Sequence, residues 1–486
     1  MRGRTGVGPV TAAVAVALVP ALVAVLQLGR VHPDEVYQAL EPAYWRAFGY
    51  GVLSWEWQVG LRNWAVPGLL SGLLRASAAL GISHPRAYRA VLELPQLVLH
   101  AASLAAVFVY ARRRLRHELA VWAVLAIGLF GPVITFAGRT LSESLSTSFL
   151  LIACALLDGF ARGPAGTRAS GDAALEAAEP PRWHAFAAGG ALGLAVVTRY
   201  PSAVFVAVAL GWLIVRRNAR AFVGVLLGGA SIALLLALLD AATWGRPFHS
   251  LLTYLDFNVL SGQAGRSYGR KPLGYYLGRL LLWAPIWAWP GIVWAARRQA
   301  PRLPLPALLA LVYAVVISVT PHKEPRFAYP ALVLFALAAA PGVLGFIEQL
   351  PRARLRRWAP ALMVALSFAP YLFRTPLDAE RGDEFRAIVR ATRSDVSRAD
   401  ATGLLLANEG PWGAGGYFYM GKNIPWLASE KATDAAFVTA LDDPKYNRAL
   451  SYDDVALEAL GRAGFRLTER VGRASIFERD TAGAPR

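Results

Sequence analysis

The sequence VHPDEVYQALEPAYWRAFGYGVLSWEWQVGLRNW occupies residues 31–64 and directly follows an apolar run at residues 9–28. It places the neighbouring acids Asp34 and Glu35 just beyond the apolar run, where an ionised carboxylate is costly and indicates a functional site. The tryptophans and acids behind this pair are typical of a segment that lies in the headgroup region of a membrane. The alternative is that both acids only cap a surface helix after Pro33.

The composition indicates an integral membrane protein. Of the 486 residues, 56% are hydrophobic and 17% are charged, and the mean hydropathy is +0.40. Apolar runs recur at about the 20-residue length that a helix needs to cross a bilayer. The net charge of +18 comes from short basic clusters between these runs, a pattern that favours membrane topology over nucleic-acid binding. The single cysteine, Cys154, excludes an intrachain disulfide and a thiolate metal cluster.

The basic clusters also predict the topology. Residues 9–28 are expected to form an uncleaved signal anchor with a cytoplasmic N-terminus. Residues 65–81 are short and contain Arg75, so we expect a helix at the outer surface. Further spans are expected at residues 90–110, 119–137, 145–160, 183–198, 202–215, 221–239, 275–296, 303–319, 331–349 and 358–374, about eleven in all. This alternation places the basic clusters inside.

The charge balance changes near residue 376. Residues 1–375 are predicted to be the transmembrane catalytic domain, with residues 31–64 as its first external loop and residues 161–182 as a disordered cytoplasmic loop. Residues 376–486 are predicted to be a small extracytoplasmic α/β domain, with strands at 403–408, 413–420 and 473–479 and a helix at 453–463. The predicted fold class is therefore an all-α polytopic membrane protein with a small C-terminal α/β soluble domain.

The same alternation assigns the unusual polar motifs to one side of the membrane. These motifs are HPDE (32–35), SWEW (54–57), RTLSES (139–144), TRYP (198–201), the loop 240–274 and HKEPRF (322–327). Carboxylates on one loop and the cations His322, Lys323 and Arg326 on another fit a sugar transfer from a lipid-linked phosphosugar. Such a transfer needs a base for the incoming hydroxyl and cations for the departing phosphate. The alternatives are snorkelling basic side chains and an interfacial aromatic belt.

These motifs also carry a family resemblance. In order and spacing over residues 25–330, HPDE with Glu41, FGYG and SWEW, Arg62, RTLSES, Phe257 with Asn258, and HKEPRF resemble the dolichyl-phosphate-mannose-dependent α-mannosyltransferases of eukaryotic N-glycan and GPI-anchor assembly. The resemblance implies the GT-C fold and a polyprenyl-phosphate sugar donor. It also implies that no cofactor, nucleotide sugar or divalent metal is required.

The resemblance assigns roles to individual residues. It makes Asp34 the general base, positioned by His32 and Glu35, and it places Glu56 in the acceptor groove. It assigns the donor phosphate to His322, Lys323 and Arg326. Further residues expected at the substrates are Trp55, Trp57, Arg62, Arg139, Glu143 and Glu324. The chain departs from the family pattern at Pro325, Ser54 and Glu143, where Glu, Thr and Asn are usual, and these departures leave the acceptor open.

The predicted function is an inverting transfer of mannose from a polyprenyl-phosphate donor to a glycan or glycolipid acceptor. The high content of Ala, Arg and Gly indicates a bacterial member in the plasma membrane, with its active site on the extracytoplasmic side. The expected partners are the donor, the acceptor and membrane lipids, without nucleic acid. A GT-C transferase of another polyprenyl-phosphate sugar is the first alternative. A transporter is the second, although its polar groups should lie near the bilayer midplane within an internal repeat.

Overall fold

The computed structural model describes residues 8–26, 28–161, 180–299, 303–373, 382–393, 401–413, 415–452 and 456–479. Most of the predicted cytoplasmic loop 161–182 lies outside the described residues. The chain divides into two compact units. We call them the helical unit (Met1–Leu22, Gly60–Ala65 and Pro95–Asp378) and the sheet unit (Val23–Val59, Val66–Leu94 and Ala379–Arg486).

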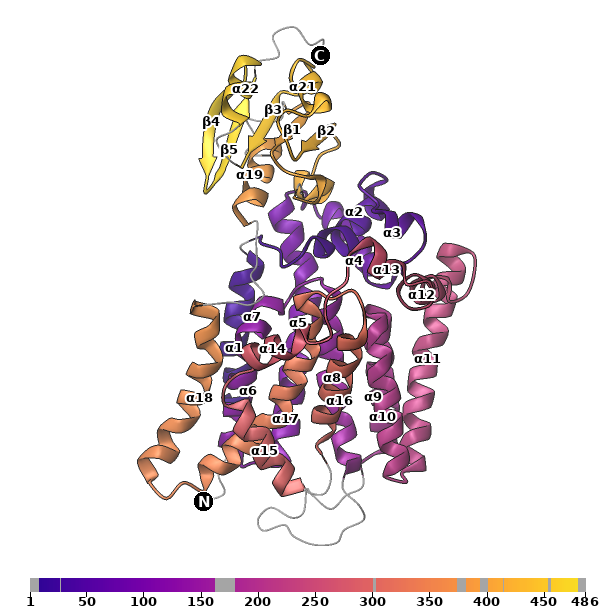
Figure 1. Cartoon of the computed structure of the whole chain (residues 1–486), viewed down its shortest axis with the longest axis vertical. Helices are drawn as coiled ribbons and strands as arrows, with labels where there is room; N and C mark the ends of the chain where they lie inside the picture. Colours follow the sequence, from indigo (N-terminus) through magenta and orange to yellow (C-terminus); the bar gives the residue numbers. More distant parts are fainter. Residues whose placement is uncertain are drawn as a thin grey trace. The chain divides into compact units, whose positions relative to one another are not determined.

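Long apolar helices build the helical unit (Figure 1). Its longer helices are α1 (Gly8–Leu26), α5 (Pro85–Arg112), α6 (His117–Gly128), α8 (Ser142–Asp158), α9 (Arg182–Thr198), α10 (Ala203–Val215), α11 (Ala219–Trp244), α15 (Ala288–Gln299), α16 (Leu305–Val319), α17 (Tyr329–Glu348) and α18 (Ala353–Phe373). Its shorter elements are α7 (Gly131–Phe136), η2 (Gly159–Ala161), η3 (Tyr200–Ser202), α12 (His249–Leu255), η4 (Asp256–Leu260), α13 (Gln263–Ser267), α14 (Tyr275–Trp283) and η5 (Pro325–Ala328). The ends of α1 and α5 extend into the sheet unit.

Within the described residues, three helices are long and apolar enough to cross a membrane. These are Pro85–Arg112, Ala219–Trp244 and Pro325–Glu348. Shorter apolar helices occur at Gly8–Val23, Ala65–Ala79, His117–Gly128, Tyr200–Val215 and Leu305–Val319. The count of about eleven spans stays a prediction.

Proline breaks two segments that the sequence predicts to be single helices. The predicted span 275–296 divides into α14 and α15, because Ala284 adopts an extended conformation before Pro285. The predicted span 119–137 likewise divides into α6 and α7, with Phe130 extended before Gly131 and Pro132.

Small residues let neighbouring helices of the helical unit pack closely. A β-carbon on Gly189 of α9 would overlap the backbone of Val225 on α11, and a β-carbon on Gly228 would overlap the backbone of Phe186. Glycine at these two positions therefore allows the backbones of α9 and α11 to touch, as in many membrane helix pairs.

The sheet unit contains η1 (Glu35–Leu40), α2 (Glu41–Phe48), α3 (Trp55–Gln58), α4 (Ala65–Ala79), α19 (Gly382–Arg393), β1 (Leu404–Ala407), η7 (Pro411–Gly413), α20 (Gly416–Met420), β2 (Trp426–Ser429), α21 (Ala435–Leu441), β3 (Arg448–Ser451), α22 (Leu457–Arg462), β4 (Arg466–Val471) and β5 (Ala474–Glu478). The strand order is β2-β1-β3-β5-β4. Strand β1 pairs in parallel with β2 and β3, and β5 runs antiparallel to β3 and β4.

Both faces of this sheet are covered. Leu404 and Leu406 of β1 belong to a core that contains Val36 and Tyr44 from the first predicted loop. The alternate residue Leu405 belongs to a second core, as the two-residue period of a strand requires. The predicted strands at 403–408 and 473–479 are therefore present as β1 and β5.

One prediction for the C-terminal part is wrong. The segment 413–420, expected to be a strand, forms α20 from Gly416 to Met420. Gly415 and Gly416 both have positive φ angles, so the chain turns at this point instead of extending, and glycine allows this conformation at little cost.

Candidate active site

The HPDE motif forms a tight turn before η1. The side chain of Asp34 is 23% exposed, and its Oδ1 atom lies 3.3 Å from Nδ1 of His32. The backbone N–H of Asp34 also donates to this nitrogen over 3.2 Å. The structure thus brings His32 and Asp34 together and leaves the Asp34 carboxylate accessible to a substrate.

Glu35 has a different environment from its neighbour. Its side chain is buried, and its carboxylate accepts a hydrogen bond from the Val31 backbone over 3.1 Å. Its backbone N–H donates to the carbonyl oxygen of His32 over 3.0 Å, while Oε1 lies 3.8 Å from Nη2 of Arg89. These contacts hold the turn in shape, as expected for a positioning residue.

Glu41 connects the first predicted loop to the C-terminal part of the sheet unit. Its buried carboxylate accepts hydrogen bonds from the backbone of Val52 over 2.8 Å, Tyr417 over 2.9 Å and Phe418 over 2.8 Å. Burial raises the pKa of Glu41 to about 7, although the three N–H donors act in the opposite direction. This residue therefore fixes structure and does not face a substrate in this conformation.

The SWEW motif contributes residues of two kinds. Glu56 accepts a hydrogen bond from Nε2 of Gln38 over 2.9 Å and is half-buried, as is Trp55. Trp57 is only 2% exposed, and its indole N–H donates to the carbonyl oxygen of Tyr37 over 3.1 Å. Trp55 can therefore offer a ring face to a sugar, whereas Trp57 packs inside the unit.

Three distant motifs meet in the helical unit. Oε1 of Glu143 in RTLSES lies 2.7 Å from Nη1 of Arg199 in TRYP and 3.6 Å from Nη1 of Arg326 in HKEPRF. Glu324 extends this network, with Oε2 2.6 Å from Nε of Arg326 and Oε1 3.0 Å from Nε2 of His322. One chain of charges thus joins three segments, of which HKEPRF lies more than 120 residues after the other two.

Aromatic residues surround this network. The guanidinium carbons of Arg199 and Arg326 lie 4.9 Å and 5.3 Å from the centre of the Phe327 ring, which is a cation–π geometry. The hydroxyl of Tyr276 donates to the carbonyl oxygen of Glu324 over 2.8 Å and accepts from its N–H over 3.1 Å. The two arginines are therefore held in fixed positions by carboxylates and an aromatic ring.

Lys323 lies in the same motif but binds the protein itself. Its side chain is 2% exposed, and Nζ donates to the carbonyl oxygens of Lys271, over 3.0 Å, and Thr320. Desolvation lowers the pKa of this ammonium group. In this conformation Lys323 joins the HKEPRF loop to the preceding loop instead of facing a phosphate.

Two other predicted arginines occupy the helical unit. Arg139 is fully buried, and its Nε donates to the carbonyl oxygen of Thr135 over 3.3 Å. Arg62 is half-buried, and its carbonyl oxygen accepts from the indole of Trp244 over 3.1 Å. Burial raises the pKa of the Tyr254 phenol, and the positive charges of Arg199 and Arg62 act in the opposite direction. Arg62 thus lies in the electrostatic neighbourhood of the network.

The structure adds three cations that the sequence reasoning missed. Arg266, Arg270 and Lys271 are exposed on the loop that the backbone of Lys271 joins to Pro321 through a 3.0 Å hydrogen bond. A signal was available, because the topology assigned this loop to the outside, where basic residues are disfavoured. These three cations are therefore exposed on a loop that contacts the HKEPRF segment.

In the described part of the chain, no three His, Cys, Asp or Glu side chains gather in a way that could hold a metal ion. The expectation that the reaction requires neither a metal nor a cofactor stays a prediction.

Comparison with known proteins identifies a family and a fold for this chain. Residues 10–375 match the model of the Alg9-like mannosyltransferase family. GPI mannosyltransferase 3 of Yarrowia lipolytica is 30% identical over 334 residues, which are 67% of this chain and 60% of the relative. GPI alpha-1,2-mannosyltransferase 3 of Mus musculus is 26% identical over 360 residues, 72% of this chain and 60% of the relative. The matched region thus spans about three fifths of these relatives.

A solved structure shows the same fold. The structure of ArnT from Cupriavidus metallidurans bound to undecaprenyl phosphate superposes with a TM-score of 0.62 at 15% sequence identity, covering 99% of this chain and 100% of that one. The predicted GT-C fold with a small C-terminal sheet is therefore confirmed. The match to the family model over three quarters of the chain also confirms the resemblance that the motifs carry, and the chain belongs to the Alg9-like mannosyltransferase family.

Proposed function

We propose that this protein is a multi-pass membrane mannosyltransferase that takes mannose from a polyprenyl-phosphate donor. The observation that carries the proposal is the convergence of RTLSES, TRYP and HKEPRF on one network of charges. Family membership and the GT-C fold support it. The acceptor would be a glycan or a glycolipid, and the basic clusters of the sequence favour an extracytoplasmic active site.

The chemistry is a direct displacement at the anomeric carbon of mannose. The acceptor oxygen forms a bond to this carbon, and the bond from the carbon to the phosphate oxygen breaks with its electron pair leaving on the phosphate. The acceptor proton passes to the carboxylate of Asp34, acting as general base. Arg326 and the exposed cations Arg270 and Lys271 stabilise the charge that develops on the leaving phosphate. Displacement in one step inverts the configuration.

Asp34→Asn tests this assignment, because it preserves the size of the side chain and removes the base. Turnover should fall by roughly 100-fold or more, while donor affinity and thermal stability stay close to those of the wild type. We would measure the transfer of labelled mannose from polyprenyl-phosphate mannose by purified variants, with a panel of lipid-linked and peptide acceptors.

A matched control is Glu458→Gln, which removes an exposed carboxylate of the same unit and should leave turnover unchanged. Near wild-type turnover in Asp34→Asn would show that Asp34 is not the base. If Glu35→Gln or Glu56→Gln is inactive at the same time, the carboxylate removed in that inactive variant is the base. Transfer from another polyprenyl-phosphate sugar, but not from the mannose donor, would identify a GT-C transferase of that other sugar.

A further inference from the structure

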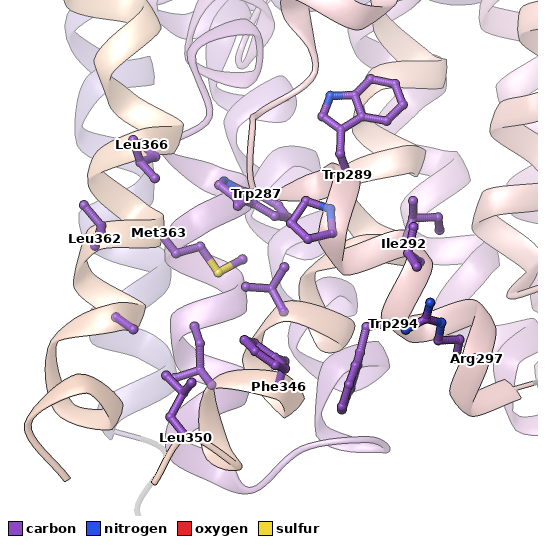
Figure 2. A pocket seen from close by; sticks show the side chains of 15 residues that line it. Trp287, Trp289, Ile292, Trp294, Arg297, Phe346, Leu350, Leu362, Met363 and Leu366 are labelled. Carbon is purple, nitrogen blue, oxygen red and sulfur yellow. The ribbon is translucent and has the colours of Figure 1, made fainter. Parts of the chain in front are cut away.

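The helical unit contains a large apolar pocket that the proposed reaction does not use. It lies between α15, α17 and α18 and has a volume of about 820 Å³. Figure 2 shows Trp287, Trp289 and Trp294 along it, with Met363 and Phe346 also lining the pocket. Arg297 is the one charged residue among the described side chains that line it.

The packing of α15 against α17 builds one wall of this pocket. A β-carbon on Gly291 of α15 would overlap Ala339 of α17, and a β-carbon on Gly342 would overlap the backbone of Gly291. The two backbones therefore touch, as in other close membrane helix pairs. The indole N–H of Trp287 donates to Oγ of Ser367 on α18 over 2.8 Å, which ties α18 to the pocket near Leu366. The packed helices α15, α17 and α18 thus form the walls of the pocket.

The other end of the pocket is cationic. Arg297 lines the pocket near the end of α15. Leu350 also lines it, and Nη1 of Arg356 donates to the Leu350 carbonyl oxygen over 2.8 Å. Both arginines are exposed. The nearest acid in sequence, Glu348, pairs with Arg116 at 2.5 Å. Charge complementarity at this end therefore selects an anion.

This cationic end lies far from the charge network of HKEPRF. Helix α17 begins at Tyr329, directly after η5 with Arg326, and ends after 20 residues at Glu348. At 1.5 Å per residue, this helix separates Arg326 from Leu350 by about 30 Å, which is roughly the thickness of the hydrocarbon core. The two cationic sites therefore serve opposite membrane surfaces, and this pocket is not the phosphate site of the donor.

The length of the pocket fits a lipid of one leaflet. The lining residues run from Trp289 to Arg297 on α15 and from Ala359 to Leu366 on α18, or about 10 to 12 Å along each helix. Half of a hydrocarbon core of about 30 Å is about 15 Å. An acyl chain that enters from the cationic end can fill the pocket without leaving its leaflet.

We propose that this pocket binds one anionic phospholipid. An acyl chain lies among the tryptophans, and the phosphate of the headgroup pairs with Arg297, while Arg356, bound to the Leu350 carbonyl oxygen, adds positive charge at this end. Basic pockets between membrane helices bind anionic headgroups in this way, and the arginine fork suits a phosphate. The exposed residues Arg352, Arg354 and Arg357 follow Leu350 closely in sequence and add to the positive charge of this segment.

Native mass spectrometry of the full-length protein, purified in detergent, tests this proposal. The probes are phosphatidylglycerol and phosphatidylcholine with identical acyl chains, titrated separately. The wild type should retain one phosphatidylglycerol in preference to phosphatidylcholine. Since each basic residue near an anionic lipid contributes about a factor of five, the double variant Arg297→Gln with Arg356→Gln should weaken phosphatidylglycerol binding by about 25-fold. The matched control is Arg220→Gln, which removes an exposed basic residue from the first turn of α11 and should leave binding unchanged.

A second variant fills the apolar part. Ala359→Phe places a ring in the pocket and should reduce the retention of both lipids, whereas Leu355→Phe, on the same helix but outside the lining, should not. Equal retention of the two lipids by the wild type, or unchanged binding by the double arginine variant, would show only non-specific lipid and would overturn the proposal. Displacement of the bound lipid by equimolar polyprenyl phosphate would also overturn it and would assign the pocket to the chain of the donor.

Discussion

The guanidinium of Arg89 lies 3.8 Å from the carboxylate of Glu35, the residue that follows the candidate base. Both side chains are 1% exposed, and Nε of Arg89 also lies 3.5 Å from Glu93 on the same helix. Nη2 of Arg89 donates to the carbonyl oxygen of Gly29 over 3.1 Å. A cation on α5 therefore links the chain before HPDE to the carboxylate inside it, and we expect Arg89 to position the turn that carries Asp34.

A double-mutant cycle on this pair should show strong coupling. Arg89→Gln leaves the buried carboxylates of Glu35 and Glu93 without their cation, a change that typically costs about 3 to 5 kcal/mol. Glu35→Gln should cost less, because Arg89 keeps Glu93. The double variant should then be more stable than the sum of the two single changes predicts, as measured by thermal unfolding in detergent.

Activity separates positioning from simple stability in the same variants. Arg89→Lys keeps the charge and should recover most of the stability lost in Arg89→Gln, yet it should lower kcat while leaving the donor KM near its wild-type value. Additive free energies in the cycle, or wild-type kcat in Arg89→Lys, would contradict a role for Arg89 in positioning the turn.

The cations of the helical unit should divide into two functional groups. Arg270 and Lys271 are exposed, so Arg270→Gln should leave stability unchanged and raise the donor KM by roughly 10-fold or more, because a hydrogen bond to a charged group is worth about 1.5 to 3 kcal/mol. Lys323→Met should instead lower the melting temperature, because its ammonium group holds two backbone carbonyls. Donor titrations and thermal melts of both variants test this division, with Arg246→Gln as the exposed control. A lower melting temperature in Arg270→Gln, or an unchanged melting temperature in Lys323→Met, would contradict it.

Sequence reasoning identified the local features of this fold better than the distant ones. Hydropathy predicted the helices of the apolar spans apart from the proline breaks at Pro285 and Pro132, but it missed short helices such as α12 and α13 in the predicted loop 240–274, and alternation predicted β1 and β5. The motifs also identified residues that converge, because Glu143 and Arg326 meet although they are 183 residues apart. Topology could group these motifs on one face, since all of them flank apolar spans.

The contacts of the C-terminal part could not be predicted in this way. Glu41 accepts from Tyr417 and Phe418, and no periodic pattern relates residues 376 positions apart. The composition changes near residue 376, and contacts group residues 379–486 with residues 23–59 and 66–94, which include most of the first predicted loop. The strand predicted at 413–420 was wrong for a local reason, because two glycines with positive φ angles begin α20.

The membrane topology can be tested with single cysteines in the native background, because Cys154 is buried. Gln58 and Ser267 are exposed on segments expected outside, and Ala219 is exposed on a segment expected inside. Gln58→Cys and Ser267→Cys should react with an impermeant thiol reagent in intact cells, whereas Ala219→Cys should react only after lysis. The reverse pattern would place the motifs in the cytoplasm and would exclude the proposed extracytoplasmic reaction.

The stability of the protein should depend on pH through Glu41. Burial raises the pKa of this carboxyl in the folded state to about 7, from 4.5 in the unfolded chain. The folded state therefore binds the proton more tightly, so the stabilising contribution is complete below pH 4.5 and is lost as the pH rises through 7. The difference of about 2.5 pH units corresponds to about 3 kcal/mol in the free energy of unfolding.

Glu41→Gln should remove this dependence, because the amide does not titrate. At low pH the protonated carboxyl still has two oxygen atoms that can face the three backbone donors, whereas the amide has only one, so the variant should lose about 1 to 3 kcal/mol there. Melting temperatures measured from pH 4.5 to 8 should fall in the wild type and stay nearly level in the variant. The exposed control Glu458→Gln should follow the wild-type curve. If Glu41→Gln shows the wild-type slope, the carboxylate of Glu41 is already ionised at pH 4.5, and its three N–H donors then outweigh the cost of burial.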